Sequence, residues 1–316
     1  MNQKGRARSP AFLVHSHFKL AWRWFSLRSF SRSLVKFFFL LPGLGYLAAM
    51  AVFPMIWSLT LSFQRWKAAT AAPRVFVGFQ NFYNILFRDT RFWNSLRFTV
   101  FYVALVVVLE LFLGLLLAYI LNERIRFRNF FRVLFLLPMA SPPIAVAFIW
   151  RMLLNPDAGV VKVILGKLGI NVVDWLTNAR LTPFVLIAVD VWEWTPFMFL
   201  GLLAAFQSLP VELYDAVSVD GASRFQAFRY VTFPLLLPIM VTLILLRAID
   251  AFKLFELVFG ITGGGPGSST ESLSYYTYTV GFQYFDLGYA CSLSWIFLVI
   301  VLVISSFLLQ RLRKEV

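Results

Sequence analysis

The chain has 316 residues, of which 60% are hydrophobic and 14% are charged, and its mean hydropathy is +0.76. A soluble domain is typically about half apolar and about a quarter charged, so this composition excludes an ordinary soluble protein. One cysteine, Cys291, and two histidines, His15 and His17, exclude a disulfide framework and a histidine-based metal centre.

The formal net charge of +14 is concentrated at the N-terminus, where residues 1–36 hold eight Lys and Arg and no acidic residue. Because no groove-reading motif accompanies this charge, we expect the tail to face anionic lipid headgroups, with no nucleic acid partner. The following apolar block is too long for a signal-peptide core, so an uncleaved anchor is expected. We therefore divide the chain into a basic cytoplasmic tail, 1–36, and a membrane domain, 37–316.

Six apolar blocks are long enough to cross a bilayer, which takes about 20 helical residues. They cover residues 37–63, 98–121, 133–154, 182–206, 233–249 and 290–309. The sequence thus predicts an all-α integral membrane protein with about six transmembrane helices. The segments that are inside when the N-terminus is cytoplasmic hold 17 Lys and Arg, against 9 in the outer loops. This bias places both termini in the cytoplasm, although the first outer loop is unexpectedly basic.

Prolines interrupt several blocks, most densely from Pro138 to Pro143 in the third. A broken helix at membrane depth persists where neighbouring helices or a water-filled cavity satisfy the freed backbone groups. The segment is therefore either a cavity lining or a set of simple kinks packed between helices. The glycines of 263–267 predict an external turn.

Ionisable residues within the apolar blocks are the strongest physical signal, because such groups normally face a protein interior or water. Asp190 and Glu193 share one helix face, as do Arg247 and Asp250, since each pair is three residues apart. They predict either a polar ligand pocket, with Trp192 and Trp194 as stacking surfaces, or ion pairs that only hold helices together. Glu110 stands alone in the second block, which favours a structural role for it.

Other function classes are less well supported. No GxxxxGK[ST] phosphate loop is present, so the chain should not bind ATP by that route. A stand-alone secondary transporter or channel would explain the buried charges, but inverted repeats are not evident. A membrane-embedded enzyme would need a catalytic set that two tail histidines do not supply.

The segment between the fourth and fifth blocks reads SLPVELYDAVSVDGASRFQAFRYVTFPLLLP. Helix formers cover 212–219, and Gly221 permits a tight turn before a second amphipathic stretch, which predicts a short helix–turn–helix on the cytoplasmic side. The segment, about 208–233, resembles the EAA loop of permeases of binding-protein-dependent ABC importers. The matching residues are Asp215-Ala216-Val217, Asp220-Gly221-Ala222, Phe228, Phe233-Pro234 and Pro238. Asp replaces the usual Glu, Val the second Ala, and Phe the Leu before Pro234.

The resemblance extends over nearly all of 35–316 and is to the carbohydrate branch, in its maltose-type first-permease group. Further stretches that carry it are 77–100, 134–150, 191–210, 247–267 and 281–292. It implies the type I importer permease fold in a prokaryotic cytoplasmic membrane. It also implies a second permease, two ATPase subunits that bind ATP and Mg in this chain's stead, and an extracytoplasmic sugar-binding protein.

The resemblance also implies roles for individual residues. ATPase coupling would fall on Asp215, Ala216, Asp220, Gly221, Ala222 and Phe228. The sugar site would fall on Met139, Asp190, Glu193, Trp194, Arg247, Asp250, Ala251 and Leu254. The charged members are those that the bilayer argument selects. Because several carboxylates would repel an anion in a low dielectric, a neutral saccharide or polyol is the expected substrate.

Overall fold

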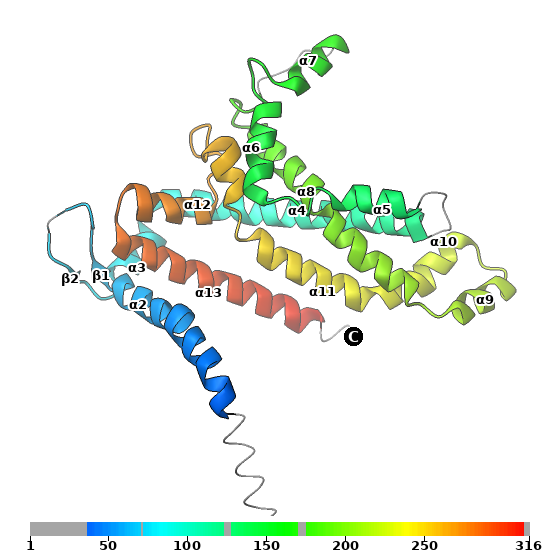
Figure 1. The fold of residues 1–316 in the computed structure, drawn as a ribbon, viewed down its shortest axis with the longest axis horizontal. Helices are drawn as coiled ribbons and strands as arrows, with labels where there is room; N and C mark the ends of the chain where they lie inside the picture. The colour runs from blue at the N-terminus through cyan, green and yellow to red at the C-terminus, as the bar shows by residue number, and fades with distance from the viewer. Residues whose placement is uncertain (1–36, 71, 123–127, 170–174, 313–316) are drawn as a thin grey trace, which may run out of the picture. The chain divides into compact units, whose positions relative to one another are not determined.

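The computed structural model describes residues 37–70, 72–122, 128–169 and 175–312. It forms two units, Met1–Thr60 and Leu61–Val316, which are described separately. One apolar helix starts at Phe37 and runs to Ser62 (Figure 1), and it includes the π-helical turn η1 (Ala48–Val52) and α2 (Phe53–Ser62). It confirms the first predicted span as a helix. The predicted basic tail, 1–36, lies outside the described residues.

Four further helices, all of the second unit, are long and apolar enough to cross a membrane. They are α4 (Thr90–Asn122), α8 (Thr182–Gln207), α11 (Phe233–Ala251) and α13 (Leu287–Leu312). α11 continues without interruption from α10 (Arg224–Ala227) and the π turn η2 (Phe228–Thr232), so the fifth span is longer than predicted. Pro234 lies within this continuous helix, directly after the π turn η2.

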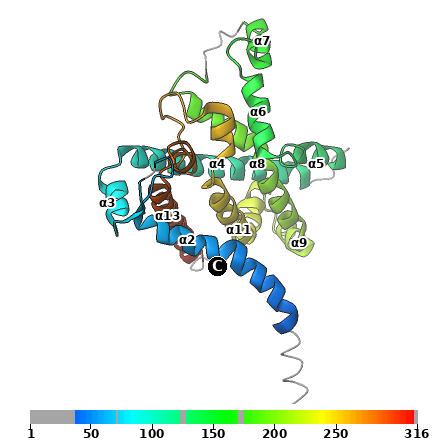
Figure 2. The ribbon, with the colours of Figure 1, turned by 60° about the vertical axis from the view of Figure 1, so that its left-hand side comes forward.

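The third predicted span, 133–154, is not one continuous helix, and its break falls in the proline-rich stretch from Pro138 to Pro143 that the sequence had marked. Its sequence forms α5 (Arg128–Leu136) and α6 (Pro143–Leu153), separated by a turn over residues 137–142. Figure 2 shows the sharp change of direction between these two helices. The cause is local, because prolines lack the N–H that would continue the helix, and Pro143 instead begins a new one.

The broken α5–α6 segment returns the chain between two parallel helices, α4 and α8. Phe101 meets Phe184 near the starts of the two helices, with ring centroids 6.1 Å apart, and Tyr119 meets Phe206 near their ends at 6.3 Å. The helices are therefore parallel, and the chain between them must return. α5 contacts α8 through the pair Phe135–Phe199, and α6 contacts it through Trp150–Trp192, two turns nearer its start.

The core lies where α4, α8 and α11 pack together, and glycines permit the close approach. A Cβ on Gly114 of α4 would lie 2.6 Å from the Cβ of Met198 on α8, and one on Gly201 of α8 would lie 2.6 Å from Leu243 of α11. Small residues at such contacts are typical of membrane helices, which associate by close packing.

Shorter elements lie at the two ends of the second unit (Figure 1). One end holds α9 (Val211–Val219) and α10. The other holds the antiparallel strands β1 (Gln64–Arg65) and β2 (Val75–Phe76), together with α3 (Gln80–Phe87) and α12 (Leu273–Tyr278). The remaining elements are α7 (Val160–Lys167), η3 (Val258–Thr262) and η4 (Thr279–Gln283). The predicted glycine turn is confirmed, since Gly263, Gly264 and Gly267 all have positive φ.

Candidate functional site

A polar cavity of about 290 Å³ lies beside the junction of α4, α8 and α11. Its lining combines apolar and aromatic side chains with several charged groups. The residues are Tyr102, Pro143, Asp190, Glu193, Trp194, Arg247, Asp250, Ala251, Lys253, Leu254, Glu256 and Leu257. Small concave sites that combine apolar walls with a few polar groups are where proteins commonly hold ligands.

Arg247 is the centre of a buried ion-pair network behind this cavity. Its Nε and Nη2 atoms donate to the two carboxylate oxygens of Glu110 at 2.8 and 2.9 Å, a bidentate pair. Nη2 also donates to Asp190, and Nη1 lies 3.7 Å from a carboxylate oxygen of Asp250. The side chains of Arg247 and Glu110 are 2% and 0% exposed. Most of the donor capacity of Arg247 is thus directed into the protein.

Glu193 differs from these paired carboxylates. It is buried and lines the cavity, yet its Oε2 atom accepts no hydrogen bond from any described residue. An unpaired buried polar atom costs free energy unless a ligand or water satisfies it. Trp194 lies alongside, with the guanidinium of Arg247 5.0 Å from its ring centroid. Asp250 has a 43% exposed side chain, so the cavity opens near it.

The structure brings seven of the eight predicted sugar-site residues to this one cavity. Met139, the eighth, is half-buried in the turn between α5 and α6 and is not among the lining residues. Trp192 is also elsewhere. With Pro138 it lines a separate, mainly apolar cavity of about 720 Å³, so the predicted pair of tryptophans does not face one pocket. Side chains two positions apart in an α-helix point about 200° apart around its axis, so Trp192 and Trp194 face different sides of α8.

Sequence reasoning underestimated Glu110, which is not isolated but is the main partner of Arg247. Its position inside an apolar block was a usable signal. The sequence could not show that its partner is Arg247, because the two residues are 137 positions apart. Tyr102, also a lining residue, gave no signal, since a tyrosine in an apolar block is common.

The predicted helix–turn–helix is present as an α9–α10 hairpin, residues 211–227. Gly221 has φ +71°, so it forms the left-handed turn that glycine favours. Ser223 then caps α10 in a capping box with Gln226. The predicted coupling residues from Asp215 to Ala222 are all exposed, whereas Phe228 is half-buried against Tyr119 of α4, with ring centroids 5.7 Å apart. Phe228 thus anchors the hairpin to the membrane helices.

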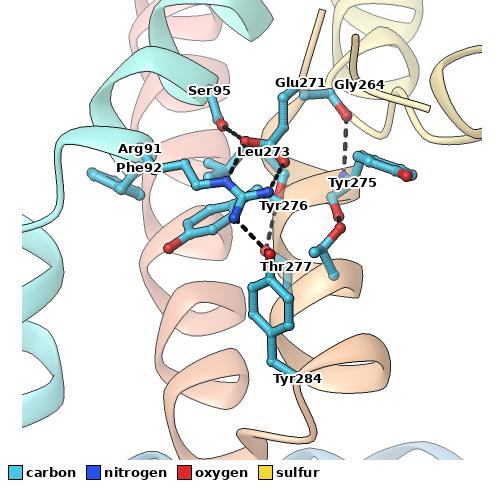
Figure 3. A network of polar contacts seen from close by, with 12 residues as sticks. Arg91, Phe92, Ser95, Gly264, Glu271, Leu273, Tyr275, Tyr276, Thr277 and Tyr284 are labelled. Carbon is cyan, nitrogen blue, oxygen red and sulfur yellow. Dashed lines mark hydrogen bonds and ion pairs between the residues drawn. The ribbon is translucent and has the colours of Figure 1, made fainter. Parts of the chain in front are cut away.

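A second polar network lies at the end of the unit away from the hairpin (Figure 3). Arg91 of α4 donates to Glu271 from Nε at 2.7 Å and from Nη2 at 2.6 Å, and from Nη1 to the Tyr284 hydroxyl at 3.0 Å. The adjacent Ser272 donates to the carbonyl of Leu254 at 2.5 Å, and Leu254 lines the polar cavity. The segment after the glycine turn is therefore fixed to α4 on one side and to the cavity wall on the other.

Comparisons with known proteins agree on one family. The sequence profile of the binding-protein-dependent transport system inner membrane component matches residues 110–313. The trehalose/maltose transport system permease protein MalF of Thermococcus litoralis is 37% identical, over 79% of this chain and 82% of its own. The arabinooligosaccharides transport system permease protein AraP of Halalkalibacterium halodurans is 30% identical, over 93% of this chain and 92% of its own.

The fold also has a counterpart among solved structures. A chain of a bacterial ABC transporter involved in the import of the acidic polysaccharide alginate superposes with a TM-score of 0.80 and 24% identity. The superposition covers 91% of this chain and 98% of that one. The arrangement of helices is therefore that of an ABC importer permease.

Proposed function

Because the chain belongs to the family of binding-protein-dependent transport system inner membrane components, we propose that it is one permease subunit of an ATP-driven sugar importer. Its polar cavity forms half of the pathway for a neutral saccharide or polyol. Family membership also decides against a stand-alone secondary transporter or a membrane-embedded enzyme, which composition alone left open. The relatives are named as permease proteins, and the chain is likewise a membrane subunit rather than the ATPase.

The observation that supports this substrate class is the charge balance of the cavity. Four carboxyl groups line it, on Asp190, Glu193, Asp250 and Glu256, against the two cations Arg247 and Lys253. Arg247 is further offset by Glu110 behind the wall. An anionic sugar would enter a surplus of negative charge in a low dielectric, where repulsion is strong. A neutral ligand can instead donate hydroxyls to carboxylates and rest on an aromatic face.

The polar residues fall into two groups, one that pairs within the protein and one that is open to a ligand. Arg247, Glu110 and Asp190 hold one another, so they stiffen the wall and orient it. Glu193 offers a free acceptor atom, Asp250 a partly open carboxylate, and Trp194 an aromatic surface. We therefore assign the ligand contacts to these three residues, with Ala251 and Leu254 as apolar wall. In this proposal, the ligand-pocket interpretation applies to Glu193, Asp250 and Trp194, and the ion-pair interpretation applies to Arg247, Glu110 and Asp190.

The α9–α10 hairpin is the proposed contact with the ATPase. Its exposed residues include large apolar ones, notably Val219 and Phe225, which are 86% and 70% exposed. An exposed apolar surface on a short ordered hairpin is typical of a protein interface. The full assembly would comprise this chain, a second permease, two ATPase subunits and an extracytoplasmic binding protein. If the broken α5–α6 segment crosses once in addition to the five long helices, both termini lie on the same side of the membrane, and the Lys and Arg bias of the loops makes that side the cytoplasm.

Replacing Glu193 by Gln tests the ligand assignment. Hydrogen bonds to charged groups contribute about 1.5–3 kcal/mol, so sugar uptake by the reconstituted importer should fall roughly ten- to hundredfold. The yield and melting temperature of the complex should stay close to wild type, because Oε2 has no hydrogen-bond partner among the residues that the structure describes. Asp157→Asn, at an exposed loop position, is the matched control. Unchanged uptake in Glu193→Gln, or a loss of assembly, would remove Glu193 from the ligand site.

The isolated chain should neither bind nor hydrolyse ATP, because its sequence holds no phosphate-binding loop. Titration of the purified subunit with a fluorescent ATP analogue checks this directly. The assembled complex serves as the positive control. Saturable nucleotide binding by the chain alone would contradict the proposed division between permease and ATPase.

A further inference from the structure

The basic first outer loop surrounds a helix with an unusual surface. Tyr83 and Phe87 of α3 and Phe79, the residue just before the helix, follow one another at intervals of four residues, so they form one aromatic stripe. All three are exposed, Phe79 and Phe87 by 73% and 72%. The opposite face of α3 is buried through Asn81 and Ile85. α3 is thus a short amphipathic helix whose aromatic face is open.

Contacts of the buried face place α3 beside the ends of the membrane helices. Asn81 donates to the carbonyls of Ser62 and Gln64 at 2.9 and 3.0 Å. Ile85 belongs to a buried cluster that also contains Phe92 of α4 and Leu293 of α13. α3 therefore packs beside the end of α2 and the starts of α4 and α13.

The aromatic surface continues onto a spanning helix. Trp93 of α4 is exposed, and its indole donates to the carbonyl of Leu86 at 2.9 Å. Further along the same face of α4, Arg97 is exposed, followed by Val100 and Phe101 within the predicted span. Aromatic residues are enriched where membrane proteins meet the membrane–water interface, and amphipathic helices there lie in its plane.

Arginines stand at both ends of the stripe. Arg65 donates to Gln80 at the start of α3, at 3.0 Å. Arg88 follows its last residue, with the guanidinium 5.5 Å from the ring centroid of Tyr83. Both side chains are exposed. Guanidinium groups pair well with phosphate oxygens, and basic groups at a membrane surface are attracted to anionic lipids.

We propose that α3 is an interfacial anchor, with its aromatic stripe in the headgroup–acyl boundary of the outer leaflet and Arg65 and Arg88 on phospholipid phosphates. This accounts for the basic first outer loop, which the positive-inside bias does not explain. The continuity of the stripe with α4 favours lipid over a soluble partner, which would leave these aromatic side chains in water whenever it dissociated.

Spin labelling of the complete importer in vesicles tests the proposal. The single cysteine allows a Cys291→Ser background in this chain, with the partner subunits made cysteine-free. A nitroxide at Tyr83→Cys should collide several-fold more often with lipid-soluble oxygen than with a water-soluble nickel chelate. The exposed turn position Thr70→Cys is the control and should show the reverse preference.

Two outcomes would overturn the anchor. If the label at position 83 behaves like the label at position 70, α3 is in water. If the solute-binding protein reduces collisions with both reagents at position 83, the stripe is a protein-docking surface. A second measurement covers failure of the labelled variants to assemble. Uptake in vesicles of increasing phosphatidylglycerol content should lose its lipid dependence in Arg65→Gln/Arg88→Gln but keep it in Lys67→Gln, and equal dependence in both would also overturn the proposal.

Discussion

Replacing Arg247 with methionine should prevent the importer from assembling in detectable yield. The change removes the one cation that contacts Glu110 and Asp190 among the described residues, and these two carboxylates are buried together. Breaking a buried ion pair by removing one partner typically costs about 3–5 kcal/mol, because the remaining charge is uncompensated. The yield and thermal stability of the solubilised complex are the measurements.

A triple variant separates this effect from a loss of ligand contacts. Glu110→Met, Asp190→Leu and Arg247→Met together remove the two carboxylates and the cation that pairs with them. Replacing a whole buried network by apolar groups of similar size is often neutral, so assembly should return. Sugar uptake is not the readout for this variant, since Asp190 also lines the cavity and its loss can change uptake directly. If Arg247→Met assembled normally and only uptake fell, Arg247 would be a ligand contact and the network would not be structural.

Replacing Gly221 with valine should uncouple transport from ATP hydrolysis while the chain remains inserted. Gly221 has φ +71°, a conformation that costs a residue with a side chain about 1–2 kcal/mol, and a β-branched one is particularly unsuited. A Cβ there would meet nothing within 4 Å, so the change should act through backbone strain rather than through a clash. Uptake and the ATPase stimulation caused by loaded binding protein should both fall at least tenfold.

Gly169 provides a matched control for this variant. It has φ +77°, and a Cβ would again meet nothing within 4 Å, but it follows α7 rather than the α9–α10 hairpin. Gly169→Val therefore introduces comparable strain without altering the hairpin, and it should retain stimulation of the ATPase. If Gly221→Val transported as well as Gly169→Val, the hairpin would not be the coupling element.

Several features of the site followed from the sequence because they depend on local chemistry. Asp190, Glu193, Arg247 and Asp250 stood out because charged side chains in apolar blocks have few stable places. The hairpin was predicted because helix formers, Gly221 and a second amphipathic stretch occur in the required order along one short segment. These inferences use only spacing of a few residues, which helix geometry fixes.

The sequence by itself determined the membrane class of the chain, the positions of most of its long helices, the hairpin and the charged residues of the cavity. Tertiary structure alone decided which of those charges pair, because Glu110 and Arg247 meet through the relative rotation of α4 and α11 and not through sequence spacing. It likewise decided that Trp194 faces the polar cavity while Trp192 faces the apolar one. Met139 lies off the cavity because the direction of a proline-broken segment depends on the helices that it packs against.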